Sequence, residues 1–216
     1  DKVLTLTGAG SAVVTGLVAD IDADGGNVDG VAQAALSGTL NVTTNTDTNT
    51  QTIEIATGTN TTTVAASDAA DTVNIDAEAM ADGKALTLSG AADVDVSNVM
   101  ADVTSTVTGD LDITLEDDAG TISTTISSTG ANNSGVVNTG TFDGDDTVVL
   151  AGTDTINVNV TDSTNVTLGD EGANLLISTG ETATINAAAA DDDKVLTLTG
   201  AGSAVVTGLV AVIDAD

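Results

Sequence analysis

Short runs of alternating apolar and polar residues recur along the whole chain. They lie at residues 3–7, 40–43, 52–55, 73–75, 86–88, 111–115, 156–160 and 184–186. Alternation with a period of two predicts β-strands that bury one face, and Gly, Asn and Asp separate the runs as they do in turns. A turn of helix is compatible with residues 31–36 and 77–81, but strong helical signals are absent. The pattern therefore predicts an all-β fold of short strands and tight turns.

The first 24 residues of the chain return almost unchanged at its end, as residues 193–216. The two stretches match at 23 of 24 positions with an offset of 193 − 1 = 192. The single difference is Asp20 in the first copy against Val212 in the second. Repetition on this scale is typical of an architectural protein built from stacked units.

A weaker copy of the same stretch lies in the middle of the chain. Residues 2–20 and 84–102 are identical at nine of 19 positions. We therefore expect a long unit that divides into two unequal parts. The expected organisation is one solenoid unit at residues 1–192, with sub-repeats at 2–83 and 84–193, and the start of the next unit at 193–216.

The near-absence of aromatic residues bears on the choice of β architecture. The chain has one Phe and no Trp or Tyr. The alternative is a series of tandem immunoglobulin-like β-sandwiches. A β-sandwich, however, fills the gap of about 10 Å between its sheets with bulky side chains. A parallel β-solenoid (β-helix) has a narrow core that small aliphatic side chains fill, and Thr and Asn on successive coils form ladders. We expect the solenoid, with roughly 20–25 residues in each coil.

The charge balance limits the partners of the chain. Its 33 acidic and three basic residues give a formal net charge of −30. Nucleic acid and anionic membrane surfaces are excluded because both attract basic residues, and no apolar run is long enough to span a membrane. Ca²⁺ is the expected cation because it prefers hard oxygen ligands. The candidate Ca²⁺ ligands are Asp20, Asp22, Asp24, Asp143, Asp145 and Asp146; the alternative is that they are solvated surface charge.

Catalytic chemistry has little support in the composition. The chain has no His or Cys, and its basic residues are Lys2, Lys84 and Lys194. Nucleophile–His, metal–His and arginine-clamp arrangements are therefore unavailable. A carboxylate pair could act on glycosides, but the aromatic platforms that usually hold sugars are missing. We expect no enzymatic activity and no catalytic residue.

Threonines alternate with other residues at positions 46–52 and 59–63. Such rows place hydroxyl groups on one face of a strand, as in ice-binding proteins. Thr is also favoured at outward-facing strand positions for its β-branched shape alone. Because the rows do not recur at one fixed coil spacing, we do not expect them to bind ice.

Residues 142–150, with the sequence FDGDDTVVL, resemble the end of the repeat-in-toxin nonapeptide, Gly-Gly-x-Gly-x-Asp-x-hydrophobic-x. The core Asp-Thr-hydrophobic recurs at residues 71–73 and 154–156. The wider texture, rich in Thr, Ala, Val, Asp and Gly, is similar to that of bacterial surface-layer proteins and giant repeat adhesins. The resemblance implies a Ca²⁺-bound parallel β-roll in a protein exported by type I secretion.

These features predict a structural repeat segment of a bacterial extracellular fibre, surface layer or giant adhesin stalk. Its expected partners are copies of itself, end to end or side by side, and cell-surface polysaccharide. The alternative is an adhesin binding module that recognises glycan or a host or abiotic surface. A binding module should contain one anomalous region, and residues 128–146, which include Phe142, are the candidate.

Overall fold

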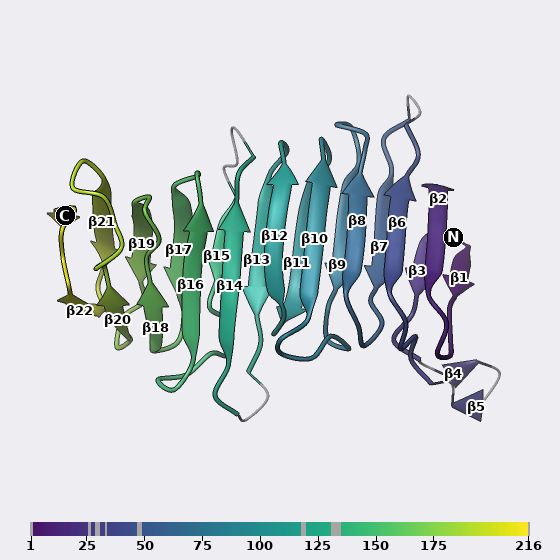
Figure 1. The fold of residues 1–216 in the computed structure, drawn as a ribbon, viewed down its shortest axis with the longest axis horizontal. Helices are drawn as coiled ribbons and strands as arrows, with labels where there is room; N and C mark the ends of the chain where they lie inside the picture. The colour runs from purple at the N-terminus through teal and green to yellow at the C-terminus, as the bar shows by residue number, and fades with distance from the viewer. Residues whose placement is uncertain are drawn as a thin grey trace.

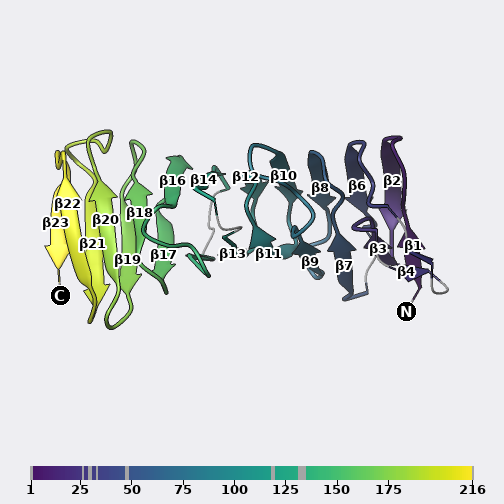
Figure 2. The same ribbon diagram turned by 90° about the horizontal axis from the view of Figure 1, so that it is seen from below.

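The computed structural model describes residues 2–25, 27–28, 31–32, 34–46, 49–117, 120–130 and 135–215. Within these residues the chain forms two long parallel sheets, of eleven and ten strands, and one small antiparallel pair. The strands follow one another along the long axis of an elongated molecule, from the N-terminus at one end to the C-terminus at the other (Figures 1 and 2). The prediction of an all-β parallel β-solenoid is confirmed.

Successive strands alternate between the two long sheets, so each coil places one strand in each sheet. The eleven-stranded sheet contains β1 (Val3–Thr5), β3 (Asp20–Asp22), β7 (Thr52–Ala56), β9 (Thr72–Asp76), β11 (Asp93–Val99), β13 (Leu111–Leu115), β15 (Val136–Asn138), β17 (Ile156–Val160), β19 (Ala173–Ile177), β21 (Val195–Gly200) and β23 (Val212–Ala215). The ten-stranded sheet contains β2 (Ala12–Leu17), β6 (Leu40–Thr44), β8 (Thr62–Ala66), β10 (Ala85–Gly90), β12 (Asp102–Val107), β14 (Ser123–Ser128), β16 (Thr147–Gly152), β18 (Thr164–Thr167), β20 (Thr182–Asn186) and β22 (Ser203–Thr207). The short antiparallel pair is β4 (Asn27–Val28) with β5 (Val31–Ala32), inserted between β3 and β6.

The coils differ in length although their strands stack in register. Ala85 of β10 pairs with Asp102 of β12, whereas the longer coil between β14 and β16 pairs Ser123 with Thr147. The insertion of β4 and β5 lengthens the coil between β3 and β7 further, where Ile21 pairs with Ile55. From β1 to β21 the eleven-stranded sheet advances by nine strand spacings. The offset of 192 residues, divided by these nine coils, gives an average coil length within the range expected from the sequence. Turns therefore absorb the variation in length.

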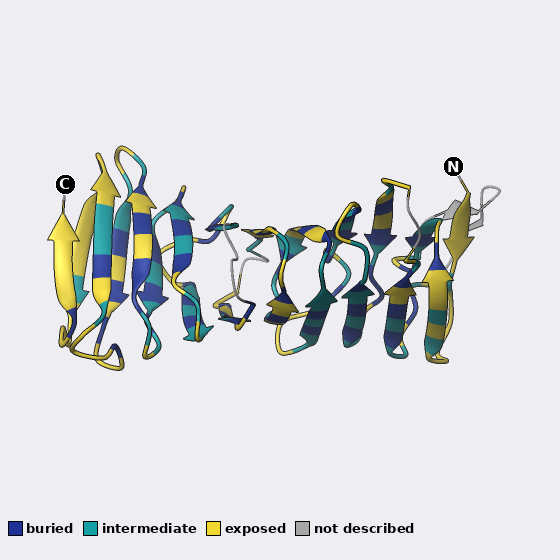
Figure 3. Cartoon of the chain, turned by 90° about the horizontal axis from the view of Figure 1, so that it is seen from above, coloured by how far each residue is buried: buried dark blue, intermediate teal, exposed yellow. Residues whose placement is uncertain are grey.

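The core lies between the two sheets and consists of small aliphatic side chains. Strand patterns such as buried–exposed–buried–exposed–buried in β13 follow the alternation of the sequence (Figure 3). Leu86, Ile113 and Val158 are buried representatives of the inward-facing rows. Full burial of one such side chain stabilises the fold by about 1.5–3 kcal/mol. Phe142, the chain's one aromatic residue, is also completely buried.

The repeated stretches form the same strands at both ends of the solenoid. Val3 pairs with Asp20 between β1 and β3, and Val195 pairs with Val212 between β21 and β23. The separation in sequence is the same in the two pairs. The middle copy keeps this separation, since Ala85 pairs with Asp102, but it lies in the ten-stranded sheet. The middle copy therefore begins three and a half coils after the first copy, and the last copy begins five and a half coils after the middle one. Because of the half coils, the same motif occurs on opposite sheets.

Glycine follows the LTL sequence in each of the three copies and is the last residue of strands β10 and β21. Gly90 and Gly200 have φ angles of 115° and 100°, which side chains of L-residues rarely adopt. A Cβ on Gly90 would collide with the carbonyl oxygen of Ala66, and one on Gly200 with that of Ile177. Each of these oxygens belongs to the preceding coil. Glycine is therefore required because the coils stack at strand spacing and the chain must turn there.

We expect Gly90→Ala to lower the free energy of unfolding by roughly 2 kcal/mol or more, from backbone strain and the displaced coil. Gly144→Ala is the matched control, because a Cβ there meets nothing within 4 Å and its φ is not positive. Urea denaturation followed by circular dichroism measures both. Equal stability of the two variants would contradict the role assigned to Gly90.

Candidate functional site

The two predicted Ca²⁺ clusters lie in different coils. Asp20 and Asp22 belong to β3, followed by exposed Asp24, and the second cluster forms the turn that enters β16. Among the described residues, no group of three or more acidic side chains is placed to hold one metal ion. The clusters therefore have to be considered residue by residue.

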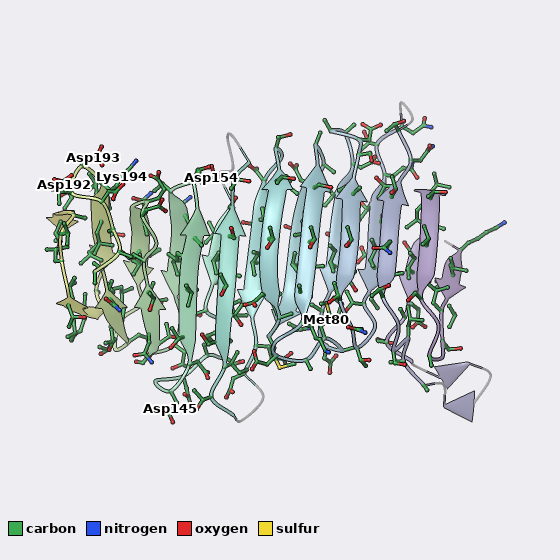
Figure 4. The ribbon with its side chains drawn as sticks, in the orientation of Figure 1. Met80, Asp145, Asp154, Asp192, Asp193 and Lys194 are labelled. Carbon is green, nitrogen blue, oxygen red and sulfur yellow. The ribbon has the colours of Figure 1, made fainter. Side chains whose placement is uncertain are left out.

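The turn at 143–146 is closed by its own hydrogen bonds. The carboxylate of Asp146 is fully buried and accepts the backbone N–H of Ile122 at 2.9 Å and that of Asp143 at 2.9 Å, one on each oxygen. Asp143 in turn accepts the N–H of Asp145 at 2.8 Å. Asp145 is exposed at the rim of the solenoid (Figure 4). The buried carboxylate of Asp146 is therefore satisfied by N–H donors without a cation.

The aspartates of the first cluster differ in their contacts. Asp20 Oδ1 accepts the N–H of Glu54 at 3.2 Å, which ties β3 to β7. Asp22 Oδ1 is buried, and none of the described residues donates a hydrogen bond to it. Burial, followed by the nearby Asp24 carboxyl, raises the pKa of Asp22. Asp22 and Asp24 are therefore predicted ligands whose carboxyl groups lie close enough to interact.

Six aspartates hydrogen bond to the backbone of an adjacent coil by a common geometry. Asp93, Asp102 and Asp112 accept N–H groups from the following coil at 2.9, 2.7 and 2.7 Å, as Asp20 does. Asp71 and Asp146 accept N–H groups from the preceding coil at 2.8 and 2.9 Å. We call these six residues the ladder-start aspartates.

Each ladder-start aspartate lies one residue before the first residue that pairs with the coil to which it hydrogen bonds. For example, Asp71 accepts from Gln51, and the next pair is Thr72 with Thr52. Asp146 accepts from Ile122, and the next pair is Thr147 with Ser123. The carboxylate thus satisfies an N–H at the point where the backbone ladder begins, which would otherwise be left without an acceptor.

The sequence contained a signal for this role. In all six cases Asp directly precedes a Val, Ile or Thr that begins the paired strand segment. The Asp-Thr-hydrophobic motif at residues 71–73 and at 146–148 belongs to this set, although by sequence alone it resembles a calcium-binding repeat. At Asp71 and Asp146 the motif serves stacking of the coils.

A second group of acids lies on the outer face of the eleven-stranded sheet. An open groove of about 740 Å³ crosses six coils there, from β1 to β13, and is lined by Asp20, Glu54, Asp76, Asp95 and Asp112, among others. Asp95 lies opposite Asp112 on the next coil. Burial first, then the carboxylates of Asp112 and Asp93, raise the pKa of Asp95 above its usual 3.8.

Glu116 resembles Asp95 in its electrostatics. Burial, followed by Glu78 and Asp76, raises its pKa, and its buried Oε2 has no hydrogen-bond partner within the described part of the chain. A raised carboxyl pKa means that the folded state binds a proton more readily than the unfolded state. The folded chain therefore gains stability as the pH falls towards the carboxyl range and loses it as the pH rises through the raised values. At neutral pH these groups oppose folding, and bound cations would relieve the repulsion.

The region expected to mark a binding module is part of the solenoid. Phe142 is completely buried, so it cannot serve as an exposed platform for sugar. Residues 128–130 and 135–146 contribute to or connect β14, β15 and β16, while residues 131–134 lie outside the described residues. The predicted threonine rows are also partly outside them, at residues 47–48.

We expect Asp146→Ala to cost about 2–4 kcal/mol of stability, because it leaves the N–H groups of Ile122 and Asp143 without their acceptor. Asp145→Ala removes the same charge from the same turn, but from an exposed side chain, and should change stability by about 0.5 kcal/mol or less. Thermal melting and urea denaturation compare the two. If the two losses are equal, charge and not the ladder start explains the effect.

Calcium stabilisation stays a prediction, now centred on Asp22 and Asp24. We expect the melting temperature to fall by several degrees when EDTA replaces millimolar Ca²⁺, because the cation offsets repulsion between carboxylates and favours the state that binds it. Asp22→Asn should remove most of this difference, and Asp145→Asn should preserve it. Sodium at matched ionic strength controls for screening. Identical melting in all these conditions would rule out a calcium role.

No family model matches this chain, and neither a curated protein nor a solved structure matches it. The described residues include no helix with the length and apolar character needed to cross a membrane. The function therefore has to be inferred from the geometry of the solenoid itself.

Proposed function

We propose that this chain is a structural repeat segment of a bacterial extracellular fibre, surface layer or giant adhesin stalk, continued end to end by further units. The role is mechanical and involves no reaction. The observation that carries the proposal is that equivalent residues of the two copies, which lie 192 positions apart, are buried at one end of the solenoid and exposed at the other.

Each end of the solenoid exposes side chains that the other end buries. Leu4 is 40% exposed in the first coil, but its counterpart Leu196 is 0% exposed because β19 lies beside it. The reverse holds for the residues that face the next coil. Leu17 is 6% exposed against 44% for Leu209.

Ile21 and Ile213 repeat this comparison, with 2% and 37% exposure. Apart from Leu176, the large exposed apolar side chains of the described residues lie in the first and last coils, at the two ends of the molecule (Figure 3). Strands β22 and β23 thus present the surface that β6 and β7 cover on β2 and β3 in the first unit. A further unit placed there would bury Leu209 and Ile213 as Leu17 and Ile21 are buried.

Such a continuation suits a load-bearing element. Both sheets would extend without interruption, and every coil is tied to the next by two parallel ladders. Heterologous contacts of this kind propagate without closing. The net charge of −30 supports an exported, soluble surface component with bound cations, and cell-surface polysaccharide is a further partner class of the proposal.

We expect a chain of residues 1–216 followed directly by a second copy of residues 25–216 to form one rod. Its length should exceed that of the 216-residue chain by about 43 Å, which is nine coils at strand spacing. Small-angle scattering and negative-stain electron microscopy measure the increment. Two beads on a flexible linker, or a compact particle, would overturn the proposal.

A further inference from the structure

The two broad faces of the solenoid differ sharply in charge. The described strands of the eleven-stranded sheet carry eight acidic residues, and those of the ten-stranded sheet carry one. The eight are Asp20, Asp22, Glu54, Asp76, Asp93, Asp95, Asp112 and Asp214. The one is Asp102, whose carboxylate is held by the N–H of Thr125. In a chain with a net charge of −30, the outer face of the ten-stranded sheet is therefore close to neutral.

Hydroxyl groups form rows across this neutral face. Thr63, Thr87 and Thr104 pair in register on the successive strands β8, β10 and β12, and Ser127 continues the row on β14. Their separations in sequence are unequal, so no fixed period is visible in the chain. In the fold they repeat at the strand spacing of about 4.8 Å. The strands that carry them lie side by side across the molecule (Figure 1).

The lysines do not neutralise either face. Lys2, Lys84 and Lys194 each lie directly before a strand, at the edge of the sheets. Lys194 is paired there with Glu171 at 2.9 Å, near Asp192 and Asp193 (Figure 4). Two copies that met through their acidic faces would oppose carboxylates without basic partners. Of the two broad faces, the neutral one allows close approach without that cost.

We propose that two copies of this chain pair side by side through the outer faces of their ten-stranded sheets. This inference rests on the proposed structural function and assigns the surface for lateral assembly. The acidic faces then point outward on both sides, about 30 Å apart across three intersheet spacings of about 10 Å, and screening at physiological salt acts over about 8 Å.

The area of the neutral face and its rows of small side chains suit such a pair. Ten strands span about 43 Å, and five residues extend about 17 Å, so the face covers about 700 Å². A standard protein interface buries about 800 Å² on each partner. Two copies carry the same period along the axis, so the row of Thr63, Thr87 and Thr104 in one copy can interdigitate with the same row in the other. A two-fold axis would make the contact self-complementary.

The test places one carboxylate on each face in turn. Thr104 on β12 and Thr114 on β13 are both exposed threonines, on the neutral and acidic faces respectively. Sedimentation of the 216-residue chain over a range of concentrations should show a monomer–dimer equilibrium. Thr104→Asp should weaken dimerisation roughly tenfold or more, because it buries an unpaired carboxylate in the interface, and Thr114→Asp should leave it nearly unchanged.

Melting curves of both variants confirm that each remains folded, and a Thr104→Ser variant should retain dimerisation. Scattering distinguishes the two modes of association, since lateral pairing enlarges the cross-section at constant length. A chain that stays monomeric, a dimer that both aspartate variants weaken equally, or a particle of doubled length and unchanged width would overturn the inference. Retention of a monomer on neutral polysaccharide would likewise overturn it and assign the face to a glycan. The rod-length experiment on the tandem chain is independent of all these outcomes.

Discussion

The backbone ladder between successive coils is the constraint on which the rest of this structure depends. Parallel pairing holds each coil at strand spacing above the last, in both sheets at once. At this distance a side chain cannot be accommodated where a turn crosses the preceding backbone, so Gly90 and Gly200 lie against the carbonyl oxygens of Ala66 and Ile177. The same spacing brings outward-facing side chains of adjacent coils into direct contact. Stability, charge and assembly all follow from that geometry.

The acidic residues take two opposite parts in this geometry. Asp71, Asp146 and the four other ladder-start aspartates satisfy N–H groups where a ladder begins, and thereby fix the register of the coils. Asp95 and Asp112 repel each other on the outer face of the eleven-stranded sheet, and burial adds to the cost of their charge. Asp112 takes both parts, because its carboxylate also accepts the N–H of Val136 where the next ladder begins.

The half-coil displacement of the middle copy has a structural consequence. The LTLxG motif starts coils on opposite sheets, since β10 belongs to one sheet and β1 and β21 to the other. The motif is thus compatible with either side of the solenoid, because both sheets impose the same pairing and the same turn. What differs between the faces is the outward-facing residue at each step. The acidic and neutral faces are therefore set by a few outward positions and not by the repeated strands.

The sequence by itself determined the fold class, the parallel stacking and the coil length, because alternation and the lack of bulky residues leave few other ways to bury small aliphatic side chains. The eight alternating runs all form strands, but strands such as β8 and β14 were not identified from the sequence. It also determined that residues 1–24 and 193–216 form equivalent strands. The candidate site was harder to predict from the sequence. Asp146 belonged to a calcium-like motif in sequence, and only the fold revealed that Ile122, on the preceding coil, donates its N–H to that carboxylate. The row of hydroxyl groups from Thr63 to Thr104 could not be predicted, because the turns between its strands differ in length. Backbone pairing between coils, and not distance along the chain, decides which residues lie side by side.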